Sequence, residues 1–72
     1  MNIKYSKPAV KAISKMDVPT KQRIKKAIEK LPEGDVKKLS GYSCAYRLRV
    51  GDWRILFDMQ EYIEITNILP RG

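Results

Sequence analysis

Apolar residues recur along this 72-residue chain first at helical spacing and then at strand spacing. A short alternating segment, Asn2 to Tyr5, predicts a first strand. Ser6 followed by Pro8 is typical of a helix start, and the spacing of the apolar residues after it predicts a helix from Lys7 to Met16. The apolar stripe of this helix is Ala9, Ala12, Ile13 and Met16.

A second helix is predicted directly after the first, because Asp17 and Pro19 repeat the start signal. Pro32 and Gly34 end it. Its apolar residues have the i, i+3, i+4, i+7 spacing of a buried stripe: Ile24, Ala27, Ile28 and Leu31. Two helices joined by so short a turn predict an antiparallel helical hairpin that packs both stripes on a sheet.

The segment from Lys38 to Phe57 predicts a β-hairpin. Gly51 and Asp52 are a two-residue turn signal between two alternating runs. Because side chains alternate along a strand, three arginines share the face opposite the core. The predicted pairs are Val50 with Trp53, Arg49 with Arg54 and Leu48 with Ile55, and the arginines are Arg47, Arg49 and Arg54.

A last strand follows, containing Ile63 and Ile65. A three-residue loop from Gln60 to Tyr62 keeps these isoleucines beside Met59 and Phe57 on the core face, whereas a two-residue loop would place them with the arginines. We predict the longer loop. The element order is then β-α-α-β-β-β, with a three-stranded antiparallel meander after the helices, and the fold class is α+β.

Composition restricts the chemistry. Fifteen Lys and Arg against eight Asp and Glu give a formal charge of +7, which favours nucleic acid, the ribosome or an acidic protein as partner. The absence of histidine excludes the usual general base near neutral pH and the commonest zinc ligand. Cys44 is the single cysteine, and we expect it to be a small buried side chain. Without a membrane-length apolar run or an apolar signal region, residues 1–72 are expected to form one cytoplasmic domain.

The predicted arginine face places Arg49 directly across from Arg54, which is unfavourable by roughly a few tenths of a kcal/mol. A solvated face without a ligand is the simplest interpretation. Guanidinium groups that converge from two strands favour an anionic partner instead, because they bind phosphate bidentately and stay charged. Lys37 and Lys38 add positive charge just before the hairpin.

The chain resembles the RelE/ParE superfamily of toxins from bacterial and archaeal type II toxin-antitoxin pairs. The resemblance covers nearly the whole chain and implies a RelE-like fold. It rests on the helical hairpin and on the segments KLSGY, YRLRVGDWRILF and ITNILPRG. The hairpin YRLRVGDWRI is the most specific of these motifs.

The resemblance to RelE-type members implies a nuclease that cuts messenger RNA in the ribosomal A site, without metal or cofactor, and that a cognate antitoxin neutralises. The basic pair of the family's second strand falls on Arg47 and Arg49, the arginine of its third strand on Arg54, and the arginine after its last strand on Arg71. Arg54 is expected at the transition-state phosphate. The expected catalytic residues are Arg49, Arg54 and Arg71, and the expected RNA- or ribosome-binding residues are Lys37, Lys38 and Arg47.

Two departures from the family pattern leave alternatives open. The family often has a basic residue where this chain has Ser40, and many active members continue into a tail with a proton-transfer group, whereas this sequence stops at Gly72. A truncated or inactive domain that only binds RNA or antitoxin is one alternative. A ParE-like inhibitor of DNA gyrase is another, although the convergent arginines favour RNA cleavage. No residue is assigned as general base.

Overall fold

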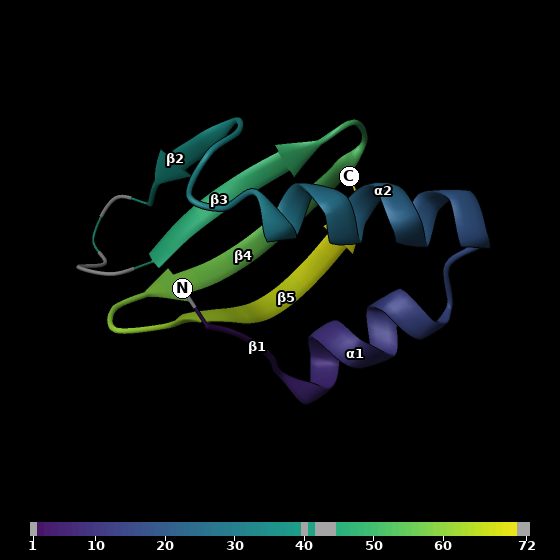
Figure 1. Ribbon diagram of the computed structural model, residues 1–72, viewed down its shortest axis with the longest axis horizontal. Helices are drawn as coiled ribbons and strands as arrows, with labels where there is room; N and C mark the ends of the chain where they lie inside the picture. The colour runs from purple at the N-terminus through teal and green to yellow at the C-terminus, as the bar shows by residue number, and fades with distance from the viewer. Residues whose placement is uncertain (1, 40, 42–44, 71–72) are drawn as a thin grey trace.

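The computed structural model describes residues 2–39, 41 and 45–70. The elements in chain order are β1 (Ile3–Tyr5), α1 (Lys7–Ser14), α2 (Val18–Glu29), β2 (Val36–Lys38), β3 (Ala45–Val50), β4 (Trp53–Met59) and β5 (Ile63–Pro70). The strands form one sheet in the order β1-β5-β4-β3-β2, in which β1 is parallel to β5 and the other neighbours are antiparallel (Figure 1). The predicted α+β class and RelE-like element order are confirmed, and β2 is an additional strand that the hydrophobic pattern did not predict.

The helix α1 begins where the sequence predicts but ends two residues early. The Ser6 hydroxyl accepts a hydrogen bond from the Ala9 amide at 3.2 Å and donates one to the Thr66 carbonyl at 2.8 Å, so the cap also ties α1 to β5. The predicted end at Met16 is wrong, because α1 ends at Ser14. Met16 nevertheless packs against the core, so the apolar stripe extends beyond the helix itself.

The register of the β3–β4 hairpin is the predicted one. Val50 pairs with Trp53, Arg49 with Arg54 and Leu48 with Ile55. Gly51 in the turn has a φ of 57°, in the left-handed region that glycine adopts most easily, and the Arg23 guanidinium of α2 lies against it. This contact brings α2 to the tip of the hairpin.

The β4–β5 pairing also confirms the predicted loop from Gln60 to Tyr62. Met59 pairs with Ile63 and Phe57 with Ile65, so all four side chains belong to the core face. The register shifts between Leu56 and Phe57, where a β-bulge falls between β4 and β5. This places Ile68 back on the core face opposite Ile55.

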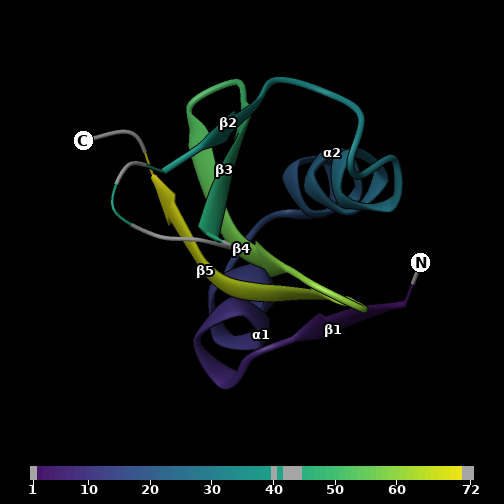
Figure 2. The ribbon, with the colours of Figure 1, turned by 90° about the vertical axis from the view of Figure 1, so that its left-hand side faces the viewer.

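Both helices pack on the same face of the sheet, with α2 against β3 and α1 against β5 (Figures 1 and 2). Tyr46 stacks on Phe57 with ring centroids 5.6 Å apart, and Trp53 packs at the margin of the core, as the alternation predicts. The buried core is Ala9, Ile13, Ile24, Ile28, Leu31, Leu48, Ile55, Phe57, Ile63, Ile65 and Ile68. Within the described residues, no helix covers the opposite face of the sheet.

Three residues that the sequence singles out, Ser40, Cys44 and Arg71, lie outside the described residues. Within the ranges that the structure describes, neither helix has the length and apolar character needed to cross a membrane.

Candidate functional site

The three arginines of the hairpin lie on the face of the sheet opposite the helices. Leu48 and Ile55 are buried in the core, and the arginines alternate with them along β3 and β4. Arg49 and Arg54 are paired across the ladder, and Arg47 is next but one to Arg49 on β3. The structure therefore brings Arg47, Arg49 and Arg54 together as a surface that we call the arginine face.

The two lysines of β2 lie on different faces. Lys37 pairs with Arg47, so its side chain belongs to the arginine face, whereas Lys38 pairs with Tyr46, which packs against the core. Both lysines are exposed. Only Lys37 therefore joins the arginines, and Arg71 lies outside the described residues.

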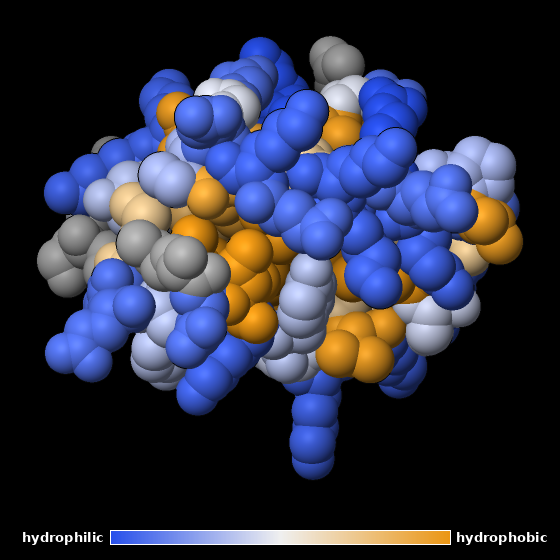
Figure 3. Space-filling model, in the orientation of Figure 1, coloured by the Kyte–Doolittle hydropathy of each residue, from blue (hydrophilic) through white to orange (hydrophobic). Residues whose placement is uncertain are grey.

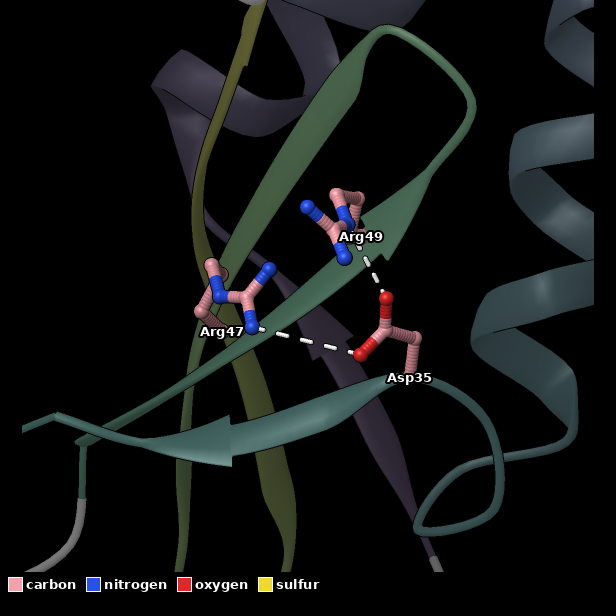
Figure 4. Close-up of polar contacts among 3 residues, drawn as sticks. All are labelled: Asp35, Arg47 and Arg49. Atoms are coloured by element: carbon pink, nitrogen blue, oxygen red, sulfur yellow. Dashed lines mark hydrogen bonds and ion pairs between the residues drawn. The ribbon is translucent and has the colours of Figure 1, made fainter.

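Asp35 is a member of the site that the sequence did not predict (Figure 4). Nε of Arg49 donates a hydrogen bond to Oδ2 of Asp35 at 2.9 Å, and Nη2 of Arg47 lies 4.0 Å from Oδ1. The signal for this contact was the pairing of β2 with β3: Val36 lies opposite Leu48, so the residue before Val36 falls opposite Arg49. Because β2 was not predicted, its neighbour could not be placed.

A groove of about 350 Å³ separates α2 from β3, and Arg49 forms part of its wall. The α2 side of the groove carries Arg23, Lys26 and Lys30. Among the described residues, these three cations form no ion pair with a carboxylate. Hydrophilic side chains accordingly gather over α2 in the space-filling view, which has the orientation of Figure 1 (Figure 3). Positive charge thus continues from the arginine face around the hairpin onto α2.

Comparison with known proteins identifies the fold. No protein-family model matches the chain, and no curated protein matches it closely. A chain in the RelB-RelE antitoxin-toxin complex from Methanococcus jannaschii is similar with a TM-score of 0.80 and 29% identity, covering 94% of this chain and 89% of that one. A chain in the archaeal RelE-RelB complex from Pyrococcus horikoshii OT3 gives a TM-score of 0.79 and 29% identity, covering 99% of this chain and 94% of that one.

The chain has the fold of a RelE-like toxin. The likeness extends over almost the whole length of both solved chains, so the elements that carry the arginine face belong to the RelE-like framework rather than to an added segment. The resemblance that the hairpin motif indicates is confirmed at the level of the fold.

The arginine face of this RelE-like chain can bind an anion and stabilise developing negative charge, because guanidinium groups supply fixed donors without changing protonation. The tyrosines that the structure describes are not placed to assist there. Burial raises the pKa of the Tyr5 hydroxyl, and the charge of Glu29 raises it further, so Tyr5 stays protonated on β1. Tyr46 faces the core, and Tyr62 lies in the β4–β5 loop with Nζ of Lys4 4.6 Å from its ring centre.

A metal site is not evident in the part of the chain that the structure describes. No group of three His, Cys, Asp or Glu side chains comes together there in the way a protein metal site requires.

Proposed function

We propose that this RelE-like chain is the toxin of a toxin-antitoxin pair and an endonuclease that cuts messenger RNA on the ribosome. The observation that carries the proposal is the convergence of Arg47, Arg49 and Arg54 on the helix-free face of a RelE-like sheet. A surface of this kind suits a phosphodiester, which is anionic and matches the fork of donors on a guanidinium.

Cleavage occurs when a ribose 2′-hydroxyl loses its proton and its oxygen attacks the adjacent phosphorus. The bond from phosphorus to the 5′-oxygen breaks, a 2′,3′-cyclic phosphate forms and the 5′-oxygen leaves with a proton, so negative charge increases on the phosphoryl oxygens in the transition state. Arg54 is assigned to this charge, because it is exposed and forms no ion pair with any described residue. Arg49 is assigned to positioning the phosphate, and Arg71 to the same role on the resemblance alone. Fixed cations need no proton transfer to act in this way.

The remaining basic residues are assigned to binding rather than to chemistry. Lys37 and Arg47 are paired on adjacent strands and hold the RNA backbone next to the scissile phosphate. Lys38 lies on the other face, so it is assigned to ribosomal RNA. None of these residues supplies a general base, and the proposal leaves that role to a group of the ribosome, the substrate or water.

A cognate antitoxin is the proposed protein partner. The two solved structures compared above, which share this fold, are complexes of RelB with RelE. An acidic segment laid over the arginine face would neutralise charges that otherwise repel one another, and would exclude RNA from the same surface. Binding of the antitoxin and of RNA is therefore expected to be mutually exclusive.

Primer extension on a reporter messenger RNA in a reconstituted translation system tests the proposal. The chain is expected to cut only translated message, and Arg54→Ala to lower the cleavage rate by roughly a hundredfold, the usual cost of removing one donor to a developing oxyanion. Lys15→Ala, which removes an exposed cation at the end of α1, serves as the matched control and is expected to leave cleavage unchanged.

Two results would contradict this interpretation. Wild-type cleavage by Arg54→Ala would remove Arg54 from the reaction. Intact message with every variant, together with inhibition of DNA supercoiling by gyrase, would replace the nuclease with a ParE-like inhibitor.

A further inference from the structure

One carboxylate serves two arginines of the arginine face (Figure 4). Oδ2 of Asp35 accepts the hydrogen bond from Nε of Arg49 at 2.9 Å, and Oδ1 lies 4.0 Å from Nη2 of Arg47. The backbone amide of Arg49 also donates to the carbonyl oxygen of Asp35 at 3.0 Å. Asp35 is thus attached to Arg49 through both its main chain and its side chain.

This hydrogen bond takes up only the inner edge of the Arg49 guanidinium. Nε donates to Asp35, Nη1 and Nη2 donate no hydrogen bond to any residue that the structure describes, and 55% of the Arg49 side chain is exposed. A guanidinium held through Nε keeps its plane while its two outer nitrogens remain available to a phosphate. The ordering of a long side chain, which a ligand would otherwise have to bring about on binding, is already complete.

The backbone around Asp35 is built to keep the carboxylate there. Gly34 has a φ of 119°, and the amide of Val36 donates to the Gly34 carbonyl at 2.9 Å, so the chain turns tightly just before β2. A Cβ at Gly34 would lie 3.0 Å from Cδ1 of Leu48, which makes glycine the residue that fits. Asp35 then falls directly opposite Arg49 as the ladder between β2 and β3 begins.

Stability alone does not account for this arrangement. Asp35 and Arg49 are both more than half exposed, and an exposed ion pair contributes about 0–1 kcal/mol to folding. The carboxylate also reduces the positive potential of a surface that has to attract an anion, so it acts against non-specific binding. Since the contact between Asp35 and Arg49 adds little to stability and weakens attraction of an anion, its remaining effect is to fix the orientation of the Arg49 side chain.

We propose that Asp35 is a positioning residue, which holds Arg49 through Nε so that the outer nitrogens of the guanidinium meet the scissile phosphate. The inference rests on the proposed function and adds to it a residue that touches no substrate. The alternative is that Asp35 acts only as a negative charge that repels the phosphate. The two roles predict opposite effects on cleavage.

Two substitutions separate orientation from charge. Asp35→Asn and Asp35→Ala remove the same charge, but asparagine keeps an oxygen that can accept the hydrogen bond from Nε. Glu33→Gln is the matched control, since Glu33 is an exposed carboxylate on the wall of the same groove and forms no ion pair with a described residue. Cleavage of messenger RNA on programmed ribosomes gives kcat and KM for each variant.

Asp35→Ala is expected to lower kcat about tenfold, because a misplaced group near the reacting phosphate costs rate even when binding persists. Its KM is expected to change no more than that of Glu33→Gln, and Asp35→Asn is expected to stay within about threefold of the wild-type kcat. Equal or faster cleavage by both Asp35 variants would overturn the positioning role in favour of simple charge repulsion.

A second measurement is independent of cleavage. In ¹⁵N NMR spectra of the whole chain, the Nε–H signal of Arg49 is expected to exchange slowly with water in the wild type and in Asp35→Asn, and rapidly in Asp35→Ala. Unchanged exchange in Asp35→Ala would overturn the inference. If the wild type cuts no translated message while this signal behaves as expected, the proposed function fails, and the hydrogen bond between Asp35 and Arg49 is still established.

Discussion

Lys37 and Lys38 are neighbours in the sequence and are both exposed, yet the pleat of β2 directs their side chains to opposite faces. Lys37 lies opposite Arg47 on the arginine face, and Lys38 lies opposite Tyr46. The pair therefore forms a comparison in which charge, chain position and exposure are nearly constant and only the face differs.

Lys37→Gln is expected to weaken binding of a short single-stranded RNA more than Lys38→Gln does. Each cation that contacts a phosphate of a single strand contributes about 0.7 to the slope of log K against log salt, so the slope should fall by about 0.7 for Lys37→Gln and remain unchanged for Lys38→Gln. Fluorescence anisotropy over a series of salt concentrations measures it. Equal changes for both variants would show that RNA does not distinguish the two faces.

At the level of single residues, the arginine face could be predicted because it depends on local features. The alternation from Arg47 to Arg49 and the turn at Gly51 are enough to set which side chains share a face. Asp35 could not be found in this way, since its contact with Arg49 spans fourteen residues and depends on a strand that has no hydrophobic signal of its own. Contacts of this kind are visible only once the pairing of the strands in the sheet is known.

Helices and strands could likewise be predicted from the sequence only where apolar residues recur at a regular spacing. Val36 is the one apolar residue of β2, and a strand with a single apolar residue has no period to detect. The end of α1 was predicted too late for the opposite reason: Met16 continues the apolar stripe and packs on the core, although α1 has already ended at Ser14. The hydrophobic pattern shows which residues are buried, and it does not show where a helix ends when buried residues continue beyond the helix.

The start of α1 depends on Ser6, whose hydroxyl caps the helix and binds the Thr66 carbonyl of β5. Ser6→Ala is expected to lower the free energy of unfolding by roughly 1–2 kcal/mol, because both a cap and a donor to a part-buried carbonyl are lost. Ser6→Asp keeps an acceptor for the cap but loses the donor to Thr66, so its free energy of unfolding should lie between those of the wild type and Ser6→Ala. Urea unfolding followed by circular dichroism measures these differences.

Ser14 provides the control for this prediction. Its hydroxyl donates to the Lys11 carbonyl at 2.7 Å in an exposed position on the same helix, so Ser14→Ala is expected to change stability by less than about 0.5 kcal/mol. A loss for Ser14→Ala as large as that for Ser6→Ala would contradict this prediction, because it would show that loss of a serine hydroxyl destabilises α1 without any link to β5.

Over the whole molecule, positive charge lies mainly in the first two thirds of the chain, and the last fifteen residues are acidic. Residues 36–57 hold five Lys or Arg and one acidic residue, whereas residues 58–72 hold one Arg and three acidic residues. The cations of α2 extend the basic side, because they line the groove that Arg49 also lines. The electrostatic potential therefore attracts a polyanion to this side of the molecule, and we expect RNA to contact the arginine face and α2 together while leaving α1 free.

A pair of double variants tests this picture. Lys26→Gln with Lys30→Gln removes two cations of the α2 groove, and Lys7→Gln with Lys11→Gln removes two exposed cations of α1 with the same change in net charge. If RNA follows the groove, the first pair should reduce the slope of log K against log salt by about 1.4, while the second should leave that slope nearly unchanged and alter affinity only through the weaker overall field.

The control makes the outcome decisive, since a loss that depended on total charge alone would be the same for both pairs. Equal reductions of the slope would place RNA over α1 as well and remove the groove as a preferred path. No reduction for the α2 pair, beside a clear reduction for Lys37→Gln, would confine RNA to the arginine face. In that case the basic surface of α2 would be a solvated helix face, and the positive charge that directs RNA would come from the hairpin alone.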